Sequence, residues 1–227
     1  MSRERSLALM SELTREMFYI ADPMCSWCYG FAPVIQGIHA QYQDRIKISL
    51  VTGGLRVGNE HRLTEELKAT LADHWKHVEE LTGQGFNYDF AVPEGFIYNT
   101  EPSCRASVVM RKHNGDEVFP FFDTLHRAFY AESRDLTDTE VLKELAESHE
   151  LDGDTFLASF EDKETLRQTY EDFAFGHNLG IRGFPSIVLK DDRGLALLTS
   201  GYQNFEDLSP VIDDWLESGA TSNAAKG

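Results

Sequence analysis

The sequence predicts an α/β protein with one mixed four-stranded sheet, interrupted by a run of helices between its second and third strands. Short apolar runs typical of strands lie near both ends of the chain, at residues 17–21, 46–50, 186–190 and 195–199. Between them, apolar residues recur every three or four positions, as on amphipathic helices. One sheet domain with a helical insertion explains this order better than two domains in series.

The N-terminal part of the sheet follows from three neighbouring segments. Residues 17–21 form an apolar run that Asp22-Pro23 ends, and residues 46–50 alternate with a period of two until Gly53-Gly54. The segment between them has apolar residues at helical spacing, and Pro33 inside it predicts that this helix is kinked or restarts. Strand, helix and strand in this order predict a parallel pair with a crossover helix.

The middle of the chain is helical throughout. The predicted helices cover residues 63–81, 101–113, 118–129, a segment beginning at the capping-box-like Thr137-Asp138-Thr139-Glu140, 152–160 and 166–177. Asp152 is the expected N-cap of the fifth of these helices, and Gly180 ends the sixth.

The C-terminal part returns to strands. Asp191-Asp192-Arg193-Gly194 between two apolar runs predicts a hairpin, and a last helix covers residues 205–216. The small, polar tail is expected to be disordered. The predicted boundaries are therefore residues 14–61 and 165–218 for the sheet domain, 62–164 for the helical insertion and 219–227 for the tail.

Composition narrows the classes of function. The 227 residues are 41% apolar and 26% charged, with 38 acidic and 21 basic side chains and a formal charge of −17. Such a surface repels phosphate backbones and anionic lipids, so we expect neither a nucleic-acid nor a membrane partner. No stretch approaches the roughly 18 apolar residues of a membrane span, and no apolar core of a signal peptide follows the N-terminus. These features predict a cytoplasmic protein.

The most specific signal is the segment Asp22-Pro23-Met24-Cys25-Ser26-Trp27-Cys28, which joins the first strand to its helix. A helix N-terminus offers unpaired N–H groups and the positive end of the helix dipole, which favour the thiolate, the nucleophilic form. Cys25 is therefore the expected attacking thiol. Cys28, one turn later, is the expected resolving thiol that releases a mixed disulfide.

Two other interpretations of these cysteines stay open. A zinc site needs a second set of ligands, and the one remaining cysteine, Cys104, has no Cys-x-x-Cys or His-x-x-x-His partner. His74 and His77 share a helix face, which we interpret as solvated, not metal-binding. An inert structural disulfide is unusual in a reducing compartment. Redox chemistry, which needs neither metal nor organic cofactor, is the prediction.

A second signal is Gly183-Phe184-Pro185-Ser186 at the entry to the third strand, a position where a proline costs no ladder hydrogen bond. Together with the cysteine motif, it predicts a cis Phe184–Pro185 bond that turns the N–H and C=O of Phe184 outward beside Cys25. Those groups would hold an extended peptide as an added strand. The alternative is a trans proline that only begins the strand.

Neighbouring side chains have auxiliary roles. Asp22 is expected to cap a turn, with proton acceptance near the redox pair as the alternative. Ser26, Trp27 and Phe184 are the expected substrate contacts, with Trp27 partly exposed. Cys104 is interpreted as a small, buried side chain, and a third redox thiol is the alternative.

The Asp-x-x-Cys-x-Trp-Cys-Tyr segment, the helical middle and the Gly-Phe-Pro-Ser segment together resemble the DsbA-like oxidoreductases, above all their cytoplasmic FrnE-like, protein disulfide isomerase-like branch. The resemblance covers nearly all of residues 17–217. It implies a thioredoxin-like fold with a helical insertion, a catalytic Cys25–Cys28 pair and Pro185 as the cis-proline facing it. Ser26 departs from the proline that the FrnE-like motif often has. Because the dipeptide between the cysteines tunes the redox potential, the direction of electron flow stays open.

The predicted function is thiol–disulfide exchange on protein or small-molecule thiols and disulfides. Kappa-class glutathione transferases and 2-hydroxychromene-2-carboxylate isomerases are similar in architecture, but their catalytic position is characteristically Ser, whereas this chain keeps both cysteines. A glutathione-dependent transferase or isomerase is therefore the alternative enzyme, and glutathione is a candidate reductant or co-substrate in either case. The non-enzymatic alternative is a chaperone-like protein whose cleft binds peptides without redox turnover.

Overall fold

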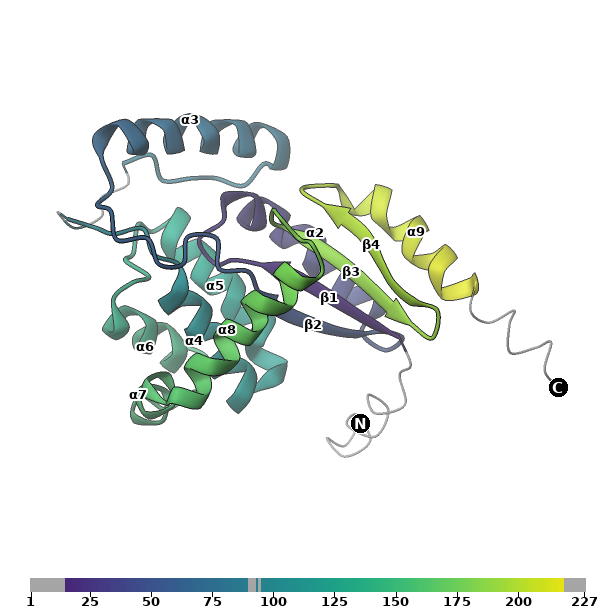
Figure 1. Ribbon diagram of the computed structural model, residues 1–227. Coiled ribbons are helices and arrows are strands. Elements are labelled where there is room, and N and C mark those ends of the chain that lie inside the picture. Colours follow the sequence, from purple (N-terminus) through teal and green to yellow (C-terminus); the bar gives the residue numbers. More distant parts are fainter. Residues whose placement is uncertain (1–14, 90–92, 94, 219–227) are drawn as a thin grey trace.

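A four-stranded sheet organises the computed structural model, which describes residues 15–89, 93 and 95–218 (Figure 1). Its strands lie in the order β2-β1-β3-β4, with bounds β1 (Glu16–Ala21), β2 (Lys47–Thr52), β3 (Ser186–Asp191) and β4 (Gly194–Ser200). β1 pairs in parallel with β2 and antiparallel with β3, and β3 pairs antiparallel with β4. The mixed sheet, its parallel first pair and its C-terminal hairpin are therefore confirmed.

Helices fill the chain between β2 and β3, as the sequence predicts. They are α3 (Glu65–Thr82), α4 (Glu101–His113), α5 (Val118–Tyr130), α6 (Thr139–Glu147), α7 (Gly153–Glu161) and α8 (Lys163–Asn178). A short 3-10 helix at Gly115–Glu117 precedes α5. The predicted limits of the insertion stay a prediction, because α8 packs against both α4 of the insertion and β2 of the sheet.

The start of α6 lies later than the capping-box pattern predicts. Asp138 caps this helix, because its carboxylate accepts a hydrogen bond of 2.9 Å from the N–H of Glu140. Thr137, the predicted cap, instead donates its hydroxyl to Asp135. Asp152 caps α7, as the sequence predicts.

The sheet is covered on both faces. Met17 and Tyr19 of β1 point into an apolar core shared with α2 (Ser26–Tyr42) and α9 (Phe205–Ser218). Phe18 and Ile20 point to the opposite face, which α8 covers in Figure 1. A third, more aromatic core gathers helices α3 to α7 around Tyr29 of α2. Helix α2 therefore joins the sheet to the helical insertion.

Helix α2 runs without interruption through Pro33, so of the two predicted outcomes the restart is wrong, and the kink stays a prediction. Pro33 lacks the N–H that would bond to the carbonyl of Tyr29 one turn earlier. The side chain of Gln84, in the segment after α3, donates to that carbonyl at 3.2 Å. A contact from a distant part of the chain thus satisfies the acceptor that the proline leaves open.

The tail predicted at residues 219–227 lies outside the described residues. Within the described part of the chain, no helix combines the length and apolar character that a membrane crossing needs.

Candidate redox site

Both cysteines of the motif lie at the N-terminus of α2. Cys25 is the N-cap residue, in an extended conformation with φ −103° and ψ 115°, and Cys28 lies in the first turn. Both thiols are free, and the residues are 5% and 0% exposed, respectively. The N–H of Cys25 bonds to the carbonyl of Asp22 at 3.1 Å, which fixes the turn into the helix. Cys25 is therefore the thiol of this pair that an incoming reagent meets first.

The environment of Cys28 keeps its thiol protonated. Burial raises the pKa of the Cys28 thiol well above its ordinary value. The hydrogen bond to Cys25 and the negative charge of the Cys25 thiolate raise that pKa further. Because the thiolate is the nucleophile, Cys28 is poorly suited to attack first. The burial and raised pKa of Cys28 fit its expected role as the resolving thiol.

The loop before β3 faces Cys25. The Phe184–Pro185 peptide bond is cis, as the sequence predicts, and the carbonyl oxygen of Phe184 accepts a weak hydrogen bond from Sγ of Cys25 at 3.7 Å. The ring of Phe184 lies on Gly53, where a Cβ atom would meet a ring carbon at 2.4 Å. The sequence indicates only that the strand pattern ends at Gly53, whereas the structure shows that the absence of a side chain there makes room for this loop.

The helical insertion holds the loop before Cys25 through hydrogen bonds that the sequence pattern does not reveal. Tyr98 donates its hydroxyl to the carbonyl of Met24 at 2.6 Å, and Nε2 of His126 contacts the carbonyl of Asp22 at 3.2 Å. Because a carbonyl only accepts, Nε2 carries the proton of this imidazole. Burial lowers the pKa of His126 to about 3, so the ring is neutral near neutral pH.

Asp22 is fully buried beside the redox pair. Its carboxylate accepts hydrogen bonds from the N–H groups of Met24, at 2.9 Å, and Leu55, at 2.6 Å, and the first of these is the predicted turn cap. Sγ of Cys104 donates to the same carboxylate at 3.4 Å. Burial raises the pKa of both the Asp22 carboxyl and the Cys104 thiol. Cys104 is therefore buried, as expected, but it has a polar contact in addition to apolar packing.

Trp27 lies at the outer edge of the site, half-buried. Its ring contacts His74 and His77 of α3 edge-on, with centroid distances of 5.9 and 5.8 Å, and Tyr202 at 6.0 Å. The interpretation of the two histidines as a solvated face is therefore incomplete, since both are exposed yet flank Trp27. Across the described residues, no three His, Cys, Asp or Glu side chains gather closely enough to hold a metal ion. Ser26 is buried.

Two solved structures are similar to this one over almost the whole chain. A Nitrosomonas europaea protein, described as a candidate protein disulfide isomerase, is 38% identical with a TM-score of 0.85, and the match covers 90% of this chain and 98% of that chain. The cytosolic disulfide reductase DsbM from Pseudomonas aeruginosa is 25% identical with a TM-score of 0.70, covering 92% of this chain and 99% of that chain.

Comparison with curated proteins and with family models gives a consistent assignment. The ClpXP adapter protein SpxH of Shouchella clausii is 21% identical over 218 residues, which make up 95% of this chain and 71% of that protein. The family model of the DSBA-like thioredoxin domain matches residues 18–213. The chain therefore belongs to the family of DSBA-like thioredoxin domains.

Proposed function

We propose that this protein is a thiol–disulfide oxidoreductase in which Cys25 attacks and Cys28 resolves. The observation that carries the proposal is the placement of two free thiols at the N-terminus of α2, with Sγ of Cys25 3.7 Å from the carbonyl oxygen of Phe184 in the cis-proline loop. Membership of the DSBA-like family supports it.

The exchange takes place in two steps. The thiolate of Cys25 attacks one sulfur of a substrate disulfide, forms a mixed disulfide and releases the other substrate sulfur as a thiolate. Cys28 then loses its proton and attacks Sγ of Cys25, which releases the second substrate thiolate and leaves a Cys25–Cys28 disulfide. The substrate gains two electrons and the protein loses two, and the reverse sequence oxidises a dithiol. The relative reduction potentials set the net direction.

Phe184 and Trp27 are the proposed substrate contacts. An extended peptide can donate an N–H to the carbonyl of Phe184, in the manner of an added strand, while its attacked sulfur approaches Cys25. The half-buried ring of Trp27 offers an apolar surface next to the same thiol. Ser26 is only 8% exposed, so we assign its side chain a smaller part in binding.

We propose glutathione as the small thiol that serves as reductant or co-substrate. We also propose that the protein acts in the cytoplasm. Two observations support this: DsbM is described as a cytosolic disulfide reductase, and a second structure of it, 23% identical to this chain, is described as solved with GSH. A glutathione transferase or isomerase needs a site for glutathione but no second cysteine. The presence of Cys28 beside Cys25 therefore favours dithiol exchange over those reactions.

A redox titration against glutathione buffers, read by thiol alkylation and mass spectrometry, tests the proposal. We expect a reversible two-electron transition that involves Cys25 and Cys28. Cys25→Ser should abolish exchange and keep the circular dichroism spectrum, and Cys28→Ser should accumulate the mixed disulfide with glutathione. Cys104→Ser, which keeps a donor toward Asp22, is the matched control and should retain the transition. Absence of any transition in the wild-type protein would contradict the proposal.

A binding function without redox turnover is a second candidate, because SpxH is named as an adapter protein of ClpXP. A purely binding protein would capture its peptide or protein partner as well as the wild-type protein does after either single substitution, Cys25→Ser or Cys28→Ser. An oxidoreductase would capture the partner as a mixed disulfide that only Cys28→Ser preserves. Partner capture by these single variants, with and without a reductant, separates the two functions.

A further inference from the structure

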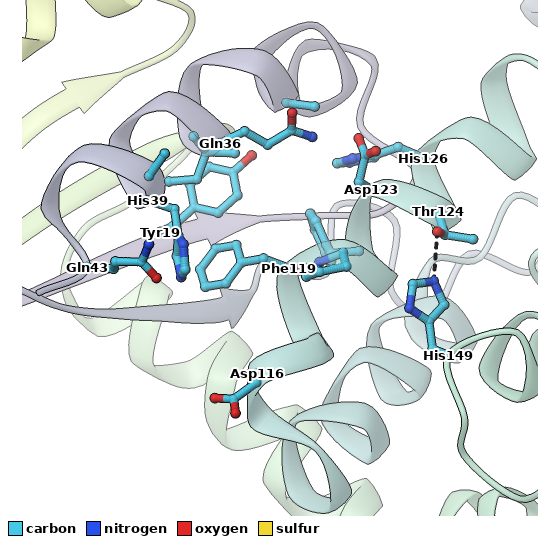
Figure 2. A pocket seen from close by; sticks show the side chains of 15 residues that line it. Tyr19, Gln36, His39, Gln43, Asp116, Phe119, Asp123, Thr124, His126 and His149 are labelled. Carbon is cyan, nitrogen blue, oxygen red and sulfur yellow. Dashed lines mark hydrogen bonds between the residues drawn. The ribbon is translucent and has the colours of Figure 1, made fainter. Parts of the chain in front are cut away.

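A cavity of about 530 Å³ lies between α2 and α5, where the sheet meets the helical insertion (Figure 2). Tyr19 of β1, Ile35 of α2, and Phe119 and Phe122 of α5 supply much of its apolar wall. Neither cysteine of the redox pair lines it. Its size falls within the roughly 300–1,000 Å³ of small-molecule sites in proteins.

Two buried polar atoms of the lining residues have no hydrogen-bond partner: Oη of Tyr19 and Nδ1 of His126. The two residues are 0% and 1% exposed. Because Nε2 of His126 donates to the carbonyl of Asp22, Nδ1 of the neutral ring is an acceptor. The hydroxyl of Tyr19 can donate or accept. Buried polar groups are nearly always hydrogen-bonded, so these two atoms indicate a place where a bound molecule would find partners.

Carboxylates carry the fixed charge among the described residues that line the cavity. The carboxylates of Asp116 and Asp123 belong to the lining, and none of the lining residues that the structure describes is Lys or Arg. Asp123 is close enough for its charge to act on the hydroxyl of Tyr19, and Arg127, on the next turn of α5, partly offsets that charge. The fixed charge of the described lining is therefore negative, and Nδ1 of His126 and Oη of Tyr19 are available as acceptors beside it.

We propose that the cavity binds a small primary amine with an apolar, aromatic or aliphatic body. Its ammonium group has three N–H donors for an acceptor set that contains the carboxylate of Asp123, Nδ1 of His126 and Oη of Tyr19. Its body packs against Phe119, Phe122 and the neighbouring aliphatic side chains, and the aromatic faces add a favourable interaction with the cation. An anionic ligand would meet the carboxylates of Asp116 and Asp123, with neither lysine nor arginine among the described lining residues to offset them.

Isothermal titration calorimetry of the full chain tests this site with 2-phenylethylamine and n-hexylamine, and with 2-phenylethanol as the uncharged isostere. We expect saturable one-to-one binding of the amines and at least tenfold weaker binding of the alcohol. Asp123→Asn should weaken amine binding at least tenfold and Tyr19→Phe about threefold. Asp192→Asn, in the β3–β4 turn, removes the same charge elsewhere and should leave binding unchanged. Circular dichroism confirms the fold of each variant.

Three results would overturn the proposal. Equal affinity for the amine and the alcohol would show that the acceptor set does not recognise the charge. Amine binding that both Asp123→Asn and Tyr19→Phe leave intact would place the probes at another site. No saturable heat with either amine at millimolar concentration would show that the cavity holds only water.

Discussion

At the scale of a single residue, the absence of a side chain at Gly53 leaves the space that the Phe184 ring of the loop opposite Cys25 occupies. A Cβ atom at this position would meet the ring of Phe184 at 2.4 Å, far inside van der Waals contact. We therefore expect Gly53→Ala to displace Phe184, to cost about 1–3 kcal/mol of unfolding free energy and to slow thiol exchange at Cys25. Urea unfolding and the rate of exchange with glutathione disulfide measure the two effects.

Gly115 offers a matched control for this substitution. A Cβ atom there would meet nothing within 4 Å, and its φ is not positive. Gly115→Ala should therefore change the unfolding free energy by less than about 0.5 kcal/mol and leave the exchange rate unaltered. If Gly53→Ala were as stable and as reactive as the wild-type protein, the loop would not depend on contact between Phe184 and Gly53.

At the scale of the elements, one ionic network joins α4 to β2 and α8. The guanidinium of Arg111 bonds to both carboxylate oxygens of Asp172, at 2.8 and 3.0 Å, and to the carbonyl of Leu50 at 2.8 Å. Asp172 also accepts hydrogen bonds from the N–H and hydroxyl of Thr52. Arg111→Ala would leave a mostly buried carboxylate without its cation, and should lower the unfolding free energy by about 2–3 kcal/mol in urea titrations.

The exposed pair Lys76–Asp73 on α3 provides the comparison for this network. Its charges are 2.9 Å apart but lie in solvent, so Lys76→Ala should cost no more than about 0.5 kcal/mol. Equal losses in the two variants would mean that the contacts of Arg111 across three elements contribute no more than a surface ion pair.

Comparison of the predicted and observed elements shows which features of the fold and the site the sequence alone predicts. Apolar periodicity and turn residues are local signals, and they predict the four strands, the helical middle and the position of Cys25 before α2. The partners of the site come from elsewhere in the chain: His74 and His77 flank Trp27, and Tyr98 bonds to the carbonyl of Met24. Periodicity places a side chain on a face of its own helix and carries no information about which distant residue meets that face.

At the scale of the whole molecule, His126 makes the contact between insertion and sheet sensitive to pH. Its pKa of about 3 lies below the ordinary value of 6.5, because burial disfavours the charged ring. As pH falls below about 6.5, the unfolded chain takes up a proton at this residue while the folded protein does not. The contribution of His126 to stability is therefore complete above pH 6.5 and is progressively lost as pH falls toward 3.

His126→Gln tests this linkage, because a glutamine can still donate an N–H to the carbonyl of Asp22 but does not titrate. Between pH 7.5 and pH 5.5, which stays above the pI of about 4.8, the wild-type protein should lose about 1–1.5 kcal/mol more unfolding free energy than the variant. Urea titrations at the two pH values measure this difference. His61→Gln, at an exposed position, should leave the wild-type pH dependence unchanged. Equal pH dependence in wild type and His126→Gln would mean that the imidazole gains its proton in the folded protein as readily as in the unfolded chain. In that case, a neutral His126 would not be what holds α5 to the loop before Cys25.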